Sequence, residues 1–159
     1  MERKKISKKT PFLPIKSEWG LICSQASIDQ ELNNISLFNI ISQINLPKKT
    51  FSQENKNKTI LFNHEIIVLF RRILNLDIDD KEFNIDVKLE IIDPKNKIIG
   101  EIYTPLNFEK GKRIMRFKFK MDSITITIPG DYVYRISIKQ LNDKNFKISY
   151  EIPLEIKNV

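Results

Sequence analysis

Four segments of this chain alternate apolar and polar residues one by one, and this period of two constrains the fold more than any other feature. The segments are 83–91, 113–121, 132–139 and 146–156. Alternation of this kind places successive side chains on opposite faces of a β-strand, with one face packed inward and the other in water. Each segment therefore predicts a half-buried strand of an antiparallel sheet.

The apolar positions of these four segments predict the inward faces of the strands. Pro153 interrupts the last segment, and because proline has no N–H to donate, we expect that strand to be an edge, or bulged, near its end. The residues expected in the core are Phe83, Ile85, Val87, Leu89 and Ile91; Met115, Phe117, Phe119 and Met121; Tyr132, Tyr134, Ile136 and Ile138; and Phe146, Ile148, Tyr150, Ile152, Leu154 and Ile156.

The N-terminal half is less regular. The segments 19–29 and 35–46 predict two strands joined by a turn at 31–34. The segment 64–74 is apolar on both faces, which suits a central strand or a helix. We favour the strand, because Ile and Val dominate the segment and Ala is absent. The polar stretch 47–63 has no periodicity and predicts a loop, either mobile or functional.

The composition agrees with a β-rich chain and with one domain. The sequence has 28 Ile and a single Ala, Ala26, and its 159 residues suit one core. We predict an all-β fold: an antiparallel two-sheet sandwich, immunoglobulin-like in architecture, with about seven to nine strands. The domain is expected over 17–159, preceded by a flexible basic arm over 1–16.

The net charge of +7 raises the question of an anionic partner. The first ten residues contribute +4 of it, and the Lys- and Asn-rich composition is also what AT-rich codons produce. On the 113–121 strand, alternate basic residues are about 7 Å apart, which is comparable to the spacing of phosphates. The alternative is a solvated face that prevents edge-to-edge pairing. The candidate anion or nucleic-acid contacts are Lys4, Lys5, Lys8 and Lys9 in the arm, and Lys112, Arg116, Lys118 and Lys120 on the strand.

The sequence offers little for catalysis or for metal binding. The single cysteine, Cys23, predicts a buried and inert thiol. The single histidine, His64, has no orienting partner nearby in sequence and is expected at the surface. No catalytic motif occurs, so we predict no enzymatic activity and no cofactor. The carboxylates of Asp77, Asp79 and Asp80 suggest a calcium site, but the spacing does not fit a calcium loop and a solvated loop is favoured.

Three stretches resemble a family of uncharacterised prokaryotic immunoglobulin-like β-sandwich proteins. These are "WGLICSQASIDQELNNISLFNIISQINLP", "DPKNKIIGEI" and "IPGDYVYRISI". The similarity runs in order over 19–156 and departs at Asn39, near which the family pattern has a small residue or glycine. The resemblance implies the sandwich fold and brings no activity with it.

These observations predict a non-enzymatic binding module. We expect an unknown protein partner to bind through a sheet edge or the 47–63 loop. The alternative is a nucleic-acid accessory protein that uses the basic arm and the 112–120 strand face. The longest apolar run, 66–70, is too short to cross a bilayer. The basic residues at the N-terminus are not followed by the apolar region of a secretory signal, so a cytoplasmic location is expected. The sequence leaves the oligomeric state open.

Overall fold

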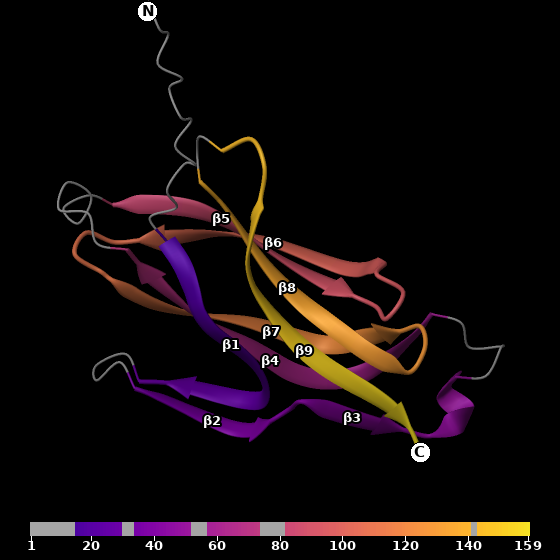
Figure 1. The fold of residues 1–159 in the computed structure, drawn as a ribbon. Coiled ribbons are helices and arrows are strands. Elements are labelled where there is room, and N and C mark those ends of the chain that lie inside the picture. The colour runs from indigo at the N-terminus through magenta and orange to yellow at the C-terminus, as the bar shows by residue number, and fades with distance from the viewer. Residues whose placement is uncertain (1–14, 30–33, 52–56, 74–81, 141–142) are drawn as a thin grey trace, which may run out of the picture.

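The computed structural model describes residues 15–29, 34–51, 57–73, 82–140 and 143–159. Within them the chain forms nine strands and one short 3₁₀ helix (Figure 1). In chain order these are β1 (Ile15–Ile28), β2 (Ile35–Ile40), β3 (Gln43–Leu46), η1 (Lys48–Phe51), β4 (Lys58–Arg72), β5 (Phe83–Ile92), β6 (Ile98–Phe108), β7 (Ile114–Ile126), β8 (Gly130–Gln140) and β9 (Lys147–Asn158).

The strands form two sheets. One has the order β2-β1-β4-β7 and is antiparallel throughout. The other has the order β3-β9-β8-β5-β6, and only the β3–β9 pair in it is parallel. The prediction of an all-β two-sheet sandwich is confirmed.

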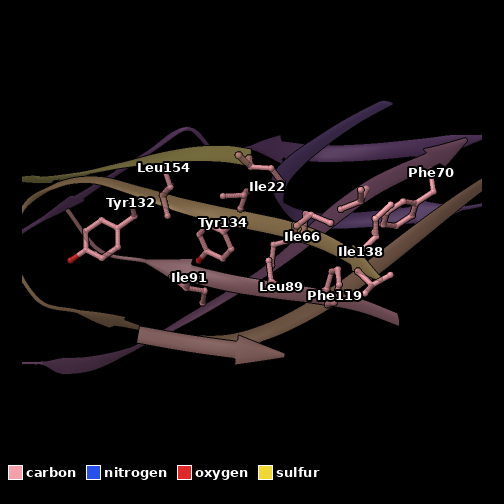
Figure 2. Close-up of a cluster of buried hydrophobic side chains, with 14 of the residues drawn as sticks. Ile22, Ile66, Phe70, Leu89, Ile91, Phe119, Tyr132, Tyr134, Ile138 and Leu154 are labelled. Carbon is pink, nitrogen blue, oxygen red and sulfur yellow. The ribbon is translucent and has the colours of Figure 1, made fainter. Parts of the chain in front are cut away.

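The main core lies between the two sheets. Figure 2 shows side chains from both sheets, among them Ile66, Leu89 and Tyr134, gathered in this space. The predicted inward faces of β5, β7 and β8 are confirmed, because their alternate apolar residues are buried in this cluster or packed against it. Burial of many Ile, Leu and aromatic side chains is the main favourable term for a fold of this kind.

The β4 strand is central, and both of its faces are covered. Ile66, Val68 and Phe70 point into the main core. Ile67 belongs to a second cluster on the other face, with Cys23 and partly buried neighbours such as Trp19. A strand with two apolar faces needs cover on both sides, and the prediction of a central strand over 64–74 is confirmed as far as Arg72, where β4 ends.

The predicted inward face of the last strand is wrong at its beginning. The β8–β9 register shifts between Ile136 and Ser137, which is a β-bulge that places one extra residue, Ser149, in β9. One extra residue reverses the alternation. Ile148 is therefore 61% exposed, and Phe146 contacts side chains of the outer face.

Pro153 lies just before the point where β3 joins β9. The Glu155 N–H donates to the Ser42 carbonyl at 2.9 Å, and the β3–β9 register starts at Gln43 and Glu155. Backbone nitrogens two residues apart in a strand face the same side, so the Pro153 nitrogen also faces the β3 side of β9. Among the described residues, β3 does not extend far enough to pair with Pro153. The missing N–H of Pro153 therefore leaves no partner unsatisfied.

Three predicted boundaries in the N-terminal half differ from the structure. The β1 strand begins at Ile15, which is buried, so the last two residues of the predicted arm are part of the sandwich. The predicted strand over 35–46 is divided between two sheets as β2 and β3, next to Asn39 with its left-handed φ of 49°. The predicted 47–63 loop is shorter, because β4 already begins at Lys58 and pairs there with β7.

A tyrosine corner fixes one end of the sandwich. The Tyr132 hydroxyl donates to the Ile128 carbonyl at 2.7 Å and accepts a hydrogen bond from the Thr127 N–H at 2.9 Å. Gly130 follows with a φ of 138°, and a Cβ there would meet Pro94 at 3.0 Å. The turn after β5 and the turn before β8 are therefore packed directly on each other.

Candidate functional site

The edge formed by residues 35–46, which we call the β2–β3 edge, is the most unusual surface of the sandwich. Figure 1 shows β2 and β3 in line along the lower border of the molecule. Each is the outermost strand of its sheet. The twelve residues contain no charged side chain and no proline, although 30% of the chain is charged.

Two large apolar side chains of this edge are in contact with solvent. Phe38 is 51% exposed and Ile40 is 66% exposed. Asn39 lies between them, and its amide donates to the Ser24 hydroxyl at 3.2 Å, while that hydroxyl donates to the Phe38 carbonyl at 3.0 Å. The side chains of β1 thus hold the edge in place, but they do not cover its apolar groups.

The other two edges of the sandwich carry charged side chains or proline, which this edge lacks. Edge strands are usually protected from further pairing by charged side chains, proline or bulges. The β7 edge carries Arg116, Lys118 and Lys120, and the β6 edge carries Glu101 and Pro105. The β2–β3 edge has neither charge nor proline to prevent pairing with another strand, and only the short lengths of its strands, six and four residues, limit such pairing.

The predicted basic face of β7 is partly engaged within the protein. The Lys118 ammonium lies 3.3 Å from a Glu65 carboxylate oxygen and donates to the Ala26 carbonyl at 3.2 Å. The other Glu65 oxygen accepts the Ala26 N–H at 2.6 Å. The β1–β4 register ends at Cys23 and Glu65, so these two side chains replace the ladder hydrogen bonds that Ala26 has lost.

The remaining candidate contacts have mixed surroundings. Lys120 is exposed, Arg116 is half-buried, and Lys112 is exposed with the Glu109 carboxylate 3.9 Å away. Binding of an anion by this face stays a prediction, and the four lysines of the arm lie outside the described residues.

The expectation that His64 lies at the surface is wrong, because the side chain is 2% exposed and sits between the sheets. Its Nδ1 is 2.7 Å from the Phe62 carbonyl and must donate to it. Its Nε2 then accepts the hydroxyl proton of Tyr134 at 2.9 Å. The two partners come from a bulge in β4 and from β8, which is 70 residues away, so no local pattern could reveal them.

Burial determines the titration of both members of this pair. Removal from water lowers the pKa of His64, and the hydrogen bond to the Phe62 carbonyl offsets only part of that effect. Burial also raises the pKa of Tyr134. Both side chains are therefore neutral near pH 7, which suits a donor and an acceptor in an apolar interior.

The prediction that Cys23 is buried is confirmed. Burial raises the pKa of its thiol, and the nearby Glu65 carboxylate raises it further. A thiol with a raised pKa carries little thiolate, which is the reactive form.

A groove that the sequence did not predict crosses the outer face of the five-stranded sheet. It has a volume of about 350 Å³ and is lined by Asp86, Tyr103, Lys139 and Phe146, among others. Phe146 is there because of the bulge in β9. The ammonium groups of Lys139 and Lys88 lie 5.1 and 5.2 Å from its ring centroid, and Lys139 also pairs with Asp86 at 3.2 Å.

The described residues contain no group of three or more His, Cys, Asp or Glu side chains that could hold a metal ion. The acidic cluster Asp77, Asp79 and Asp80 lies outside them. No helix in the described part of the chain is long and apolar enough to cross a membrane.

Comparison with known proteins defines the class of fold. No family model matches the chain, and no curated protein matches it. The solved C-terminal domain of wzt is similar over 92% of this chain and 75% of that chain, with a TM-score of 0.52 and 11% sequence identity. A β-glucuronidase from glycoside hydrolase family 2 is similar over 73% of this chain and 13% of that chain, with a TM-score of 0.43 and 17% identity. The chain is a two-sheet β-sandwich protein, and at 11% identity its likeness to the wzt domain concerns the fold alone.

Proposed function

We propose that this chain is a non-enzymatic binding module that docks an extended, uncharged segment of a partner protein along the β2–β3 edge. The observation that carries the proposal is the absence of charge and proline from residues 35–46, at the edge of both sheets. A partner strand beside β2 would pair with backbone groups on the side facing away from β1.

Strand addition to an open edge combines two kinds of interaction. Main-chain hydrogen bonds supply affinity, and pockets for alternate side chains supply specificity. Phe38 and Ile40 already present apolar surface at this edge, and covering them would contribute about 25 cal/mol per Å² of area removed from water. No charged group of the edge would lose its hydration in the process.

The nucleic-acid alternative has less support. Lys118 is held by Glu65 and Ala26, so it has to leave these contacts before it can reach a phosphate. The aromatic side chains of β7, Phe117 and Phe119, pack toward the core and offer no stacking surface.

The proposal retains two expectations from the sequence. One is a cytoplasmic location, and the other is a relationship to the prokaryotic immunoglobulin-like proteins that share the Asp-Pro and Pro-Gly turns. Both turns are present, and they pack on each other at Pro94 and Gly130.

Site-specific photo-crosslinking tests the docking surface. A photoreactive phenylalanine analogue at position 38 should crosslink to one partner in cells, and the purified partner should then bind the purified chain. The substitution Ile40→Lys should weaken that binding by at least about tenfold, because it places a charge in a desolvated strand interface.

Leu61 provides the matched control, since it is 91% exposed on the same sheet but lies in β4. The analogue at position 61 should not crosslink to the same partner, and Leu61→Lys should leave the affinity unchanged. Equal crosslinking at both positions, or an affinity that Ile40→Lys does not change, would overturn the proposal. A crosslink to a second copy of the chain would identify the partner as the protein itself.

A further inference from the structure

The turns that resemble the immunoglobulin-like family also form a cavity that the docking edge does not use. The cavity has a volume of about 580 Å³ and lies between the β5–β6 turn, the end of β7 and the start of β4. A volume of this size is typical of sites for small molecules. We call it the corner cavity, because the tyrosine corner forms one of its walls.

Two lysines give the corner cavity a positive charge. Lys95 and Lys97 both line it, and neither has an ion-pair partner among the residues that the structure describes. The one carboxylate in the lining belongs to Asp93. The charge of these three lining side chains is therefore +1, from two lysines and one aspartate.

The Asp93 carboxylate is already occupied by donors from the protein. One oxygen accepts the N–H groups of Lys95 at 2.9 Å and Lys97 at 2.8 Å, and the other accepts the Thr127 hydroxyl at 2.9 Å. Burial alone would raise the pKa of Asp93, but these hydrogen bonds and the charge of Lys97 lower it overall. The Asp93 carboxylate holds the turn in shape. Because it accepts these hydrogen bonds, its charge repels an incoming anion less strongly than the charge of an unpaired carboxylate would.

Two walls of the corner cavity are held by hydrogen bonds within the protein. The Asp93 hydrogen bonds hold the β5–β6 turn, and the Tyr132 hydroxyl holds Thr127 and Ile128. Pro94 packs on Gly130 between these two structures. A site held in this way loses little conformational entropy when it binds a ligand.

We propose that the corner cavity binds a small phosphate-bearing molecule. Ammonium groups bind phosphate as point charges, and here the Asn57 amide and the Thr125 hydroxyl add neutral hydrogen-bonding groups around them. Apolar side chains, including Ile98 and Ile128, line the rest of the cavity and suit the non-phosphate part of the molecule.

Titration of the 159-residue chain with phenyl phosphate, followed by amide NMR, tests this inference. We expect saturable shifts confined to residue 57 and to residues 93–99 and 125–130, and weaker binding of inorganic phosphate. Benzoate and phenol, which keep the ring but lack the phosphate, should bind at least about tenfold more weakly, because they form fewer charge-assisted hydrogen bonds.

The double substitution Lys95→Gln and Lys97→Gln should weaken phenyl phosphate binding by at least about tenfold. Lys16→Gln with Lys144→Gln removes the same charge from exposed positions that do not line the cavity, and should leave the affinity within about twofold. Unsaturable or scattered shifts, benzoate binding as tight as that of phenyl phosphate, or an equal loss in both variants would overturn the inference. The β2–β3 edge is not involved, so either proposal can fail without the other.

Discussion

His64 is neutral in the folded protein because its ring lies between the two sheets, with Phe62 stacked on it at 4.7 Å. Its pKa is lowered from the usual value near 6.5 by burial, so the unfolded chain takes up the proton first as the pH falls. The stability that depends on neutral His64 is fully present above about pH 6.5 and is lost as the pH drops toward the folded-state pKa.

We therefore expect urea denaturation to show a lower free energy of unfolding at pH 5 than at pH 7.5. The substitution His64→Gln keeps a donor and an acceptor but cannot be protonated in this range, so it should flatten the dependence. His64 is the only histidine, and no other side chain with an ordinary pKa titrates there. The same pH dependence in the variant would show that another group is responsible.

The contribution of the Tyr132 hydroxyl to the free energy of unfolding can also be measured by a single substitution. Tyr132→Phe should lower the free energy of unfolding by about 1–3 kcal/mol, since the part-buried N–H of Thr127 and the Ile128 carbonyl lose their partner. The exposed Tyr103 is the matched control, and Tyr103→Phe should change stability by less than about 0.5 kcal/mol. Equal unfolding midpoints in urea for the two variants would contradict this role.

At the scale of the strand, the basic residues of β7 have different roles although they share one face. Lys118 and Glu65 satisfy the backbone of Ala26 where β1 separates from β4, while Lys120 is exposed. The alternation in the sequence placed both lysines on the outer face but could not tell them apart. The difference depends on Glu65, which belongs to the neighbouring strand.

The two lysines should therefore respond differently to the same substitution. Lys118→Gln should lower the free energy of unfolding by about 1 kcal/mol, because the Ala26 carbonyl and the Glu65 carboxylate lose a charged donor. Lys120→Gln should change it by less than about 0.5 kcal/mol. Chemical denaturation of both variants measures the difference, and a larger loss for Lys120→Gln would refute the structural role of Lys118.

The bulge in β9 shows why the face of a strand can be predicted only in part. The alternation from Ile152 to Ile156 is kept, and these residues are buried as expected. At Ser149 the chain gains a residue, and the Ser149 side chain turns inward to contact the Ser17 hydroxyl at 2.6 Å. That contact joins residues 132 apart in the chain, so the reversal of the face at Ile148 and Phe146 follows from packing against β1.

At the scale of the whole molecule, the net charge of +7 makes salt dependence the property that distinguishes protein docking from nucleic-acid binding. Removal of residues 1–14 takes away +4 and leaves +3. Docking along an uncharged edge should be nearly independent of salt, whereas phosphate contacts make log K fall linearly with log salt.

We expect partner affinity to change by less than about threefold between ~0.05 and ~0.5 M salt, both for the full chain and for a chain that starts at Ile15. Fluorescence anisotropy with the partner and with single- and double-stranded oligonucleotides measures both dependences. The nucleic-acid alternative would be favoured instead if oligonucleotide binding depends steeply on salt and weakens when residues 1–14 are removed.

The sequence by itself determined that the chain is a β-sandwich and which residues of β5, β7 and β8 form its core. These properties depend on the alternation within each strand, which is local. The tertiary structure decided the order of the strands, the division of 35–46 between two sheets, the burial of His64 and the bulge in β9. The uncharged run at 35–46 is visible in the sequence, but only the strand order places it at an open edge. Each of these features depends on contacts between residues far apart in the chain, which the pattern within one strand does not specify.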